Sequence, residues 1–212
     1  MALAYRKQID HDTSFAVWKI EESAEELLDQ LQLKEHENSF LETLNGGKRN
    51  LHWLSTRVLL RSMLNTNKYI DCRIDEHGKP YLENMPHQIS LSHSFDYAAV
   101  IVSETKAVGI DIELIKNKIE RIAFKFMNKS ELNFIDKQHA IEHMYVCWCA
   151  KEAIYKLQGK RNVSFLDHIY LHPFPYSQSG CFDAKIEIEN NVSNFKVLYE
   201  KFHEYMIGYV TE

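Results

Sequence analysis

The order of helix-like and strand-like segments limits what this chain can fold into more than any other feature of its sequence. Helical periodicity dominates residues 24–64, apolar β-branched segments follow over 88–115, helical periodicity returns over 118–160, and strand-like segments fill the rest. No low-complexity linker separates the two rounds. The sequence therefore predicts an α+β fold in two halves, residues 1–104 and 105–212.

Local signals mark the ends of two helices. Ser23 and Glu26 have the spacing of a capping box, so a helix is expected to begin after Ser23. The long segment HAIEHMYVCWCAKEAIYKLQGK is largely apolar and is expected to stop near Gly159. QISLSHS (88–94) and YAAVIVS (97–103) are predicted to pair as a hairpin, and four strands are expected in the tail.

The composition is that of an ordinary globular protein and narrows the function classes. Of 212 residues 45% are hydrophobic, so a sizeable core needs no disulfide or structural metal. A formal net charge of −5 argues against a general nucleic-acid binder. The four cysteines form no CxxC pair and are expected to be small buried residues in a reducing cytoplasm. No signal peptide and no apolar run of about 18 residues is present, so a cytoplasmic protein without a membrane span is expected.

A basic helix is expected over residues 48–64, where leucine, valine and methionine line one face. Four positive charges and no acid lie in this segment, at Lys48, Arg49, Arg57 and Arg61. A solvated helix surface would explain many runs of this kind. In a chain with a negative net charge, the local excess also suggests an anion-binding surface.

Two carboxylates in the segment GIDIE have the spacing of a metal site. Side chains alternate along a strand, so Asp111 and Glu113 point to the same face. Oxygen ligands two residues apart can converge on a hard cation such as Mg²⁺. The alternative is an amphipathic edge strand with a charged outer face, and this segment alone favours that alternative.

The helix segment WCAKEAIYK is harder to explain by solvation. Trp148, Lys151, Glu152 and Lys156 are spaced i, i+3, i+4 and i+8, which predicts one stripe on a helix. Glu152 and Lys156 could form a simple surface pair worth a few tenths of a kcal/mol. The apolar neighbours indicate a largely buried helix, however, so the charges need partners. Phosphates and a divalent cation would supply them, with Glu152 as a third oxygen ligand.

The segment SLSHS places three serines on one face of a strand and His93 on the other. A lone strand histidine is more often structural than functional, but with Lys79 of GKPY it could donate to a phosphate. The remaining histidines have no HxH or HExxH spacing, which argues against zinc. The chain also lacks Walker A, GxGxxG and GxSxG motifs.

GKPYL, ISLSHS, VGIDIE and WCAKEAIYK occur in this order between Gly78 and Lys156. The ordered set resembles the 4′-phosphopantetheinyl transferases of the surfactin-synthetase-activating type. The resemblance implies a pseudo-dimer of two similar α/β halves, each an antiparallel sheet packed on a long helix. It also implies a reaction in which phosphopantetheine moves from coenzyme A to a serine of an apo acyl or peptidyl carrier protein, releasing adenosine 3′,5′-bisphosphate.

The same resemblance assigns roles at the pyrophosphate of coenzyme A. Asp111, Glu113 and Glu152 would hold Mg²⁺, for which Mn²⁺ could substitute. Lys151 and Lys156 would contact the phosphates, and Lys156 could protonate the leaving group. The incoming serine needs a base, and Glu152 is the nearest candidate. Whether Glu152 serves as ligand, base or both stays open.

The nucleotide end of coenzyme A would be held by residues from earlier in the chain. By the resemblance, Ser92 and His93 would bind the nucleotide portion, and Lys79 would lie near the adenine or ribose. Candidates for the 3′-phosphate are Lys48, Arg49 and Arg57.

Two other functions compete with a cytoplasmic, monomeric, Mg²⁺-dependent transferase. A catalytically silent module would bind coenzyme A or a carrier protein without turnover. A nucleotide phosphohydrolase using the same carboxylates would release phosphate with no carrier present. The carrier itself, whether from fatty-acid, polyketide or peptide synthesis, is not specified by the sequence.

Overall fold

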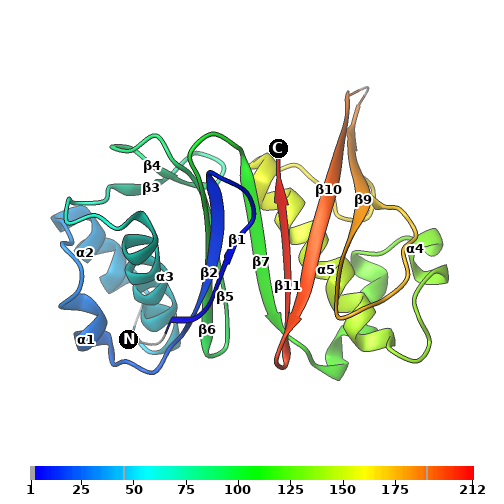
Figure 1. The fold of residues 1–212 in the computed structure, drawn as a ribbon, viewed down its shortest axis with the longest axis horizontal. Helices are drawn as coiled ribbons and strands as arrows, with labels where there is room; N and C mark the ends of the chain where they lie inside the picture. The colour runs from blue at the N-terminus through cyan, green and yellow to red at the C-terminus, as the bar shows by residue number, and fades with distance from the viewer. Residues whose placement is uncertain (1–2, 45, 190) are drawn as a thin grey trace. The chain divides into compact units, whose positions relative to one another are not determined.

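A computed structural model describes residues 3–44, 46–189 and 191–212 (Figure 1). The chain divides into two compact units, each with its own sheet and helices. The first contains residues 1–75 and 80–106, and the second contains 76–79 and 107–212. The division between Lys106 and Ala107 lies two residues from the predicted boundary, and the loop 76–79 belongs to the second unit. The α+β class predicted from the sequence is confirmed.

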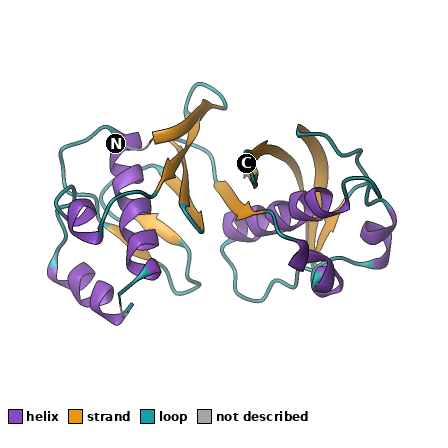
Figure 2. Cartoon of the chain, turned by 90° about the horizontal axis from the view of Figure 1, so that it is seen from below, coloured by secondary structure: helices purple, strands orange, loops and turns teal. Residues whose placement is uncertain are grey.

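The first unit is a four-stranded antiparallel sheet with helices on one face (Figures 1 and 2). Its strand order is β1-β2-β6-β5, and a separate two-stranded ribbon pairs β3 with β4. Its elements are β1 (Leu3–Gln8), β2 (Thr13–Lys19), α1 (Ala24–Leu28), α2 (Glu35–Thr43), α3 (Lys48–Leu64), β3 (Cys72–Ile74), β4 (Pro80–Leu82), β5 (Gln88–Ser94) and β6 (Tyr97–Ser103).

Helix α3 packs on β2, β5 and β6 and provides much of the core of this unit. The predicted capping box at the start of α1 is present: Ser23 Oγ accepts from the Glu26 amide, and the Glu26 carboxylate accepts from the Ser23 amide. The sequence patterns do not predict β1 and β2. The reason for β2 is that TSFAVWK lies in the interior of the sheet, where both faces are buried and the apolar–polar alternation disappears.

The second unit is a five-stranded antiparallel sheet crossed by one long helix. The strand order is β7-β11-β10-β9-β8, and α5 packs on β7 and β11. Its elements are β7 (Val108–Leu114), η1 (Asn117–Arg121), η2 (Ala123–Lys125), α4 (Lys129–Asn133), α5 (Ala140–Gln158), β8 (Ile169–Leu171), β9 (Ser179–Ile188), β10 (Asn191–Phe202) and β11 (Tyr205–Thr211). Helix α5 ends at Gly159 in the left-handed conformation, as predicted.

Two glycines let the backbone of α5 approach the sheet. A Cβ atom on Gly109 of β7 would lie 1.9 Å from the Ala153 carbonyl oxygen, and one on Gly208 of β11 would lie 2.9 Å from Cys149. Neither contact is sterically tolerable without a backbone shift. The close approach brings the polar residues of α5 next to those of β7.

Gly109→Ala is therefore expected to destabilise the protein toward the upper end of about 1–3 kcal/mol, the usual cost of overpacking. The predicted contact is with a backbone carbonyl, which cannot rotate away. Gly208→Ala should cost less, because its predicted contact is longer. Urea denaturation of both variants measures this order, and equal stability of Gly109→Ala and the parent chain would contradict the packing described.

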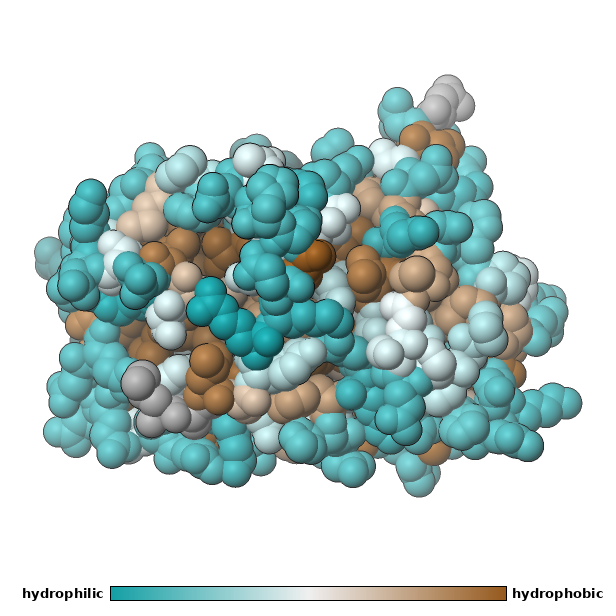
Figure 3. Space-filling model, in the orientation of Figure 1, coloured by the Kyte–Doolittle hydropathy of each residue, from teal (hydrophilic) through white to brown (hydrophobic). Residues whose placement is uncertain are grey.

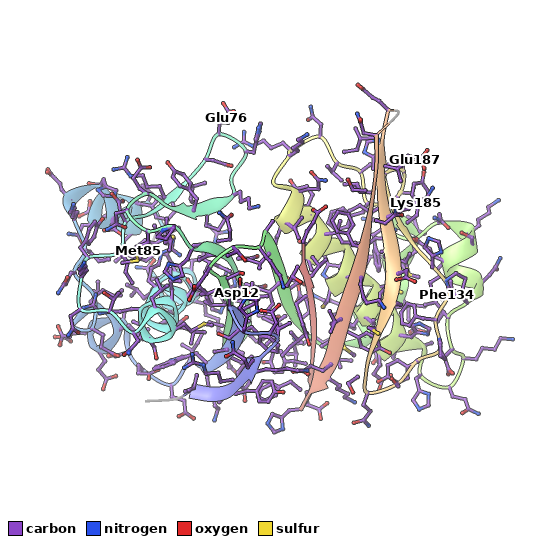
Figure 4. The ribbon with its side chains drawn as sticks, turned by 45° about the horizontal axis from the view of Figure 1, so that its top comes forward. Asp12, Glu76, Met85, Phe134, Lys185 and Glu187 are labelled. Carbon is purple, nitrogen blue, oxygen red and sulfur yellow. The ribbon has the colours of Figure 1, made fainter. Side chains whose placement is uncertain are left out.

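An aromatic cluster surrounds His143 of α5, which is fully buried. Its neighbours are Phe174, Tyr176 and Phe134, the last labelled in Figure 4. Nδ1 accepts a hydrogen bond from the Asp136 amide at 3.0 Å, so the ring proton lies on Nε2, which is buried and has no partner among the described residues. Burial lowers the pKa of His143.

This geometry predicts acid lability. The folded-state pKa of His143 lies below its ordinary value of 6.5, so the unfolded chain binds more protons as the pH falls through 6.5, and stability is lost in that window. His143→Asn, whose Oδ1 can accept from Asp136, should lose less stability than the parent between about pH 7 and 5. Thermal melts at each pH measure this difference, and parallel pH profiles would contradict it.

Three of the four cysteines, Cys72, Cys147 and Cys149, are buried free thiols, as expected. Cys181 corrects the expectation, because it is exposed at the start of β9, near the end of the sheet. Among the described residues, no helix has the length and apolar character needed to cross a membrane.

Candidate functional site

A cluster of charged side chains lies where α5 crosses β7. Lys156 donates to Asp111 Oδ1 at 2.8 Å and to the Ile110 carbonyl at 3.0 Å. Asp111 is only 4% exposed, and the neighbouring Ile110 and Ile112 of the same strand are also buried. A charged pair this close to the core requires a specific reason, since burying charges is costly.

Glu152 lies one turn before Lys156 on the same helix and belongs to the same cluster. Burial, together with the negative charges of Asp111 and Glu113, raises the pKa of Glu152 to about 7, while Lys156 opposes the shift. Three carboxylates therefore share the field of one nearby ammonium group. At neutral pH Glu152 is poised between its charged and neutral forms.

The charge balance of this cluster fits a divalent cation. Asp111 and Glu113 raise the pKa of Glu152, because nearby negative charges disfavour its ionised form. When all three carboxylates are ionised, Lys156 alone does not balance their charge. Carboxylate oxygens are the ligands that Mg²⁺ prefers. The oxygen ligands of Asp111, Glu113 and Glu152 therefore fit a Mg²⁺ ion.

A small cavity of about 70 Å³ lies beside Glu113. It is lined by Lys118, Ile119, Ile122, Tyr145 and Trp148 together with Glu113. Trp148 packs edge-on against Phe126, with ring centroids 4.9 Å apart, and in a tilted arrangement against Phe165, with centroids 5.7 Å apart. These contacts fix the orientation of this side of α5. The cavity extends the charged cluster toward an apolar wall.

Lys151 requires a correction, because it does not join this cluster. Its side chain is fully buried, and its ammonium donates to Glu131 Oε2, the Phe165 carbonyl and the Ile169 carbonyl, each at 2.8 Å. Those three bonds use all three donors of the ammonium group. At about 100° per residue, Lys151 lies about 140° around the helix from Lys156, too far to share its stripe. We therefore do not include it among the phosphate contacts.

Lys79 lies in the loop between β3 and β4, within the second unit. Its Nζ donates to the Leu157 carbonyl at 2.6 Å, and its aliphatic stem passes Gly159, so it covers the C-terminal end of α5. A cation there complements the helix dipole. Its acceptor, Leu157, is the residue that follows Lys156 in α5.

In the first unit, a separate positive cluster of Lys48, His52 and His93 lies where α3 meets the β5–β6 turn. His52 stacks on His93 with ring centroids 4.2 Å apart, and its Nε2 lies 2.7 Å from the Phe95 carbonyl. The Lys48 ammonium lies 5.5 Å from the centre of the Phe95 ring. Ser92 is buried on the opposite face of β5 from the exposed His93, as the alternation predicts. Sequence reasoning misses His52, although its position four residues after Lys48 could have indicated a shared helix face.

Arg49 and Arg57 have different environments on α3. Arg49 is exposed in the first turn of α3, next to Lys48. Arg57 instead stacks on Trp53, with its guanidinium carbon 4.1 Å from the ring centre. Arg57 is about 140° around the helix from His52, so it does not belong to the positive cluster at Phe95.

Among known proteins, the chain is similar to 4′-phosphopantetheinyl transferases. Residues 107–209 match the family model described as the 4′-phosphopantetheinyl transferase superfamily. The chain is 32% identical over 119 residues to 4′-phosphopantetheinyl transferase AcpT of Escherichia coli K12. The aligned segment covers 53% of this chain and 60% of that protein. It is 28% identical over 150 residues to 4′-phosphopantetheinyl transferase Sfp of Bacillus subtilis 168, covering 62% of this chain and 66% of that protein.

A third relative, a putative 4′-phosphopantetheinyl transferase of Haemophilus influenzae, is 38% identical over 94 residues, 40% of this chain and 38% of that protein. The chain thus spans less than two thirds of the length of these relatives. The family match contains β7 and α5, the two elements that carry Asp111, Glu113, Glu152 and Lys156. Residues 107–209 of this chain are therefore similar to the 4′-phosphopantetheinyl transferase superfamily.

Proposed function

We propose that this chain transfers the 4′-phosphopantetheine group of coenzyme A to a serine hydroxyl of an apo acyl or peptidyl carrier protein and releases adenosine 3′,5′-bisphosphate. One observation carries the proposal. The helix α5 sets Glu152 and Lys156 against Asp111 of β7, within the segment that matches the family. That arrangement combines acidic metal ligands with an ammonium group, as transfer from a pyrophosphate requires.

Asp111, Glu113 and Glu152 would hold Mg²⁺, or Mn²⁺ in its place. When bound, the cation would neutralise the charge that gathers on the pyrophosphate. Lys156, already fixed by Asp111 and the Ile110 carbonyl, would donate to the phosphate that leaves. These groups do not need to reorganise as the bond breaks, so their stabilisation is available in the transition state.

In the transfer step, the serine oxygen forms a bond to the β-phosphorus of coenzyme A, and the bond from that phosphorus to the bridging oxygen breaks. The serine proton must go to a base. A pKa of about 7 suits Glu152 to this role near neutral pH, when it is not serving as a cation ligand. The leaving group departs as adenosine 3′,5′-bisphosphate.

The first unit would hold the nucleotide end of coenzyme A. His93, His52 and Lys48 provide adjacent donors at the β5–β6 turn, and Arg49 is exposed beside them. Anionic phosphate groups prefer such positions, since donors and positive charge converge there. Ser92 and Lys79 complete the residues proposed for this end. We further propose that the protein acts as a cytoplasmic monomer.

A labelling assay tests the function. The protein is incubated with a fluorescent coenzyme A analogue, Mg²⁺ and a panel of apo carrier proteins, with a competent transferase in parallel. Fluorescence should appear on at least one carrier. If no carrier is labelled while the control enzyme labels all of them, the transferase proposal is wrong. Binding of coenzyme A without labelling would favour a silent binding module.

The cation site has a test that does not depend on activity. Mg²⁺ or Mn²⁺ should raise the melting temperature of the parent chain, because an ion that binds the folded state stabilises it by mass action. Asp111→Asn should lose this shift. Glu142→Gln, which alters a carboxylate near the start of the same helix, should keep it. A full shift in Asp111→Asn would refute the ligand assignment.

A further inference from the structure

A second cavity, of about 220 Å³, lies in the first unit among α2, α3 and β3. Apolar surface is visible between α3 and β3 on the face drawn in Figure 3. The cavity is open to solvent, because two of its apolar wall residues, Phe40 and Ile74, are 40% and 51% exposed. Its complete lining is His36, Glu37, Phe40, Trp53, Arg57, Cys72, Arg73 and Ile74.

Arg57 is the unusual group in this wall. Its guanidinium stacks on Trp53, and its Nη1 donates to Thr56 Oγ1 at 3.1 Å. The Nε atom is buried and has no hydrogen-bond partner among the described residues. A guanidinium has five donors arranged in a planar fork, and a buried charge without acceptors is costly.

The neighbouring acids do not supply these acceptors. Among the described residues, no carboxylate oxygen lies within 4.0 Å of an Arg57 nitrogen. Glu37 Oε2 is occupied by the Tyr69 hydroxyl at 2.7 Å and the Lys34 amide at 3.1 Å.

The other cation of the wall is already neutralised. Arg73 forms two hydrogen bonds to Asp71, at 3.0 and 3.1 Å, so its charge is balanced within the protein. Arg57 therefore remains the cation with donors to offer. Burial lowers its pKa, which reflects the same lack of compensation.

We propose that this cavity binds a small carboxylate with an aromatic or branched apolar body. The carboxylate would accept from the fork of Arg57, and the body would lie against Phe40, Trp53 and Ile74. Arginine binds carboxylates in this bidentate geometry. Sites for drug-sized ligands usually have volumes of about 300–1,000 Å³, so the ligand here is smaller than these.

This site is separate from the positive cluster at Phe95. Trp53 and Arg57 lie about 100–140° around α3 from His52, so they face another side of the helix. The proposal therefore does not rest on the proposed transferase function, and either can fail without the other.

Binding of 4-fluorobenzoate and of its neutral counterpart, 4-fluorobenzamide, tests the proposal. The protein is labelled with 5-fluorotryptophan, and Trp53→Phe identifies the Trp53 signal by fluorine NMR. The benzoate should shift that signal and bind at least ten times more tightly than the amide. Arg57→Met should remove the preference, and Phe40→Ala should weaken both ligands alike.

Two variants guard against misreading a folding defect. Arg57→Lys keeps the charge without the fork and should bind the benzoate more weakly while retaining some preference over the amide. Arg121→Met removes an exposed arginine from the second unit and should bind as the parent does. Equal binding of benzoate and amide, no shift of the Trp53 signal, or a folded Arg57→Met that keeps the preference would overturn the proposal. Solvent alone would then fill the cavity.

Discussion

Asp111→Ala and Glu152→Gln are each expected to reduce phosphopantetheine transfer by at least ~10²-fold, the scale on which loss of a group that stabilises charge at a reacting centre is felt. Asp111 both fixes Lys156 and belongs to the proposed cation site. Glu152 is the proposed third ligand or the base. Rates of carrier labelling under saturating coenzyme A measure both losses.

Stability separates loss of chemistry from loss of fold. The raised pKa of Glu152 means that the folded protein without cation binds more protons than the unfolded chain between about pH 4.5 and 7, so ionised Glu152 lowers stability as the pH rises through that window. Glu152→Gln should therefore melt at or above the temperature of the parent at pH 8. Glu142→Gln, on the same helix, should retain activity. A near-parental rate in Glu152→Gln would refute its role.

Lys151→Met is expected to cost about 3–5 kcal/mol of stability, the usual result of removing one partner from a buried ion pair. Glu131 would remain buried with its charge uncompensated, since it is only 1% exposed. Glu131 also accepts from the Asn128 and Leu171 amides, so the pair ties α4, α5 and β8 together. Denaturant unfolding measures the loss.

Two comparisons sharpen this expectation. Glu131→Gln combined with Lys151→Met should recover part of the stability, because no buried charge is left unpaired. Lys185→Met removes one partner of a half-buried pair on β9, labelled in Figure 4, where Lys185 and Glu187 lie 2.7 Å apart. That change should cost less than about 1 kcal/mol. Similar losses in Lys151→Met and Lys185→Met would contradict the structural role of Lys151.

The sequence predicts those parts of the molecule whose signals are local. The capping box at Ser23 and the stop of α5 at Gly159 depend on a few neighbouring residues, and both are present. The alternation in SLSHS likewise gives the faces of Ser92 and His93. Strand β2 escapes prediction because its residues are buried on both faces, so its own pattern lacks the alternation that marks a strand.

For the charged residues of the site, too, some positions follow from local spacing and others do not. Helical spacing brings Glu152 and Lys156 together, and packing against β7 adds Asp111. Spacing fails for Lys151, because its acceptors come from α4, from the segment before β8 and from β8 itself, which no local pattern connects to α5. Arg57 differs, because helical spacing itself places it about 140° around α3 from His52, where it stacks on Trp53 one turn earlier.

Release of adenosine 3′,5′-bisphosphate from coenzyme A tests the central claim most directly. It is measured with an apo carrier protein and with the same carrier whose modified serine is replaced by alanine. Release should require the serine, match the amount of modified carrier one to one, and stop in Asp111→Ala. Release that is equal with both carriers would contradict group transfer and indicate hydrolysis instead.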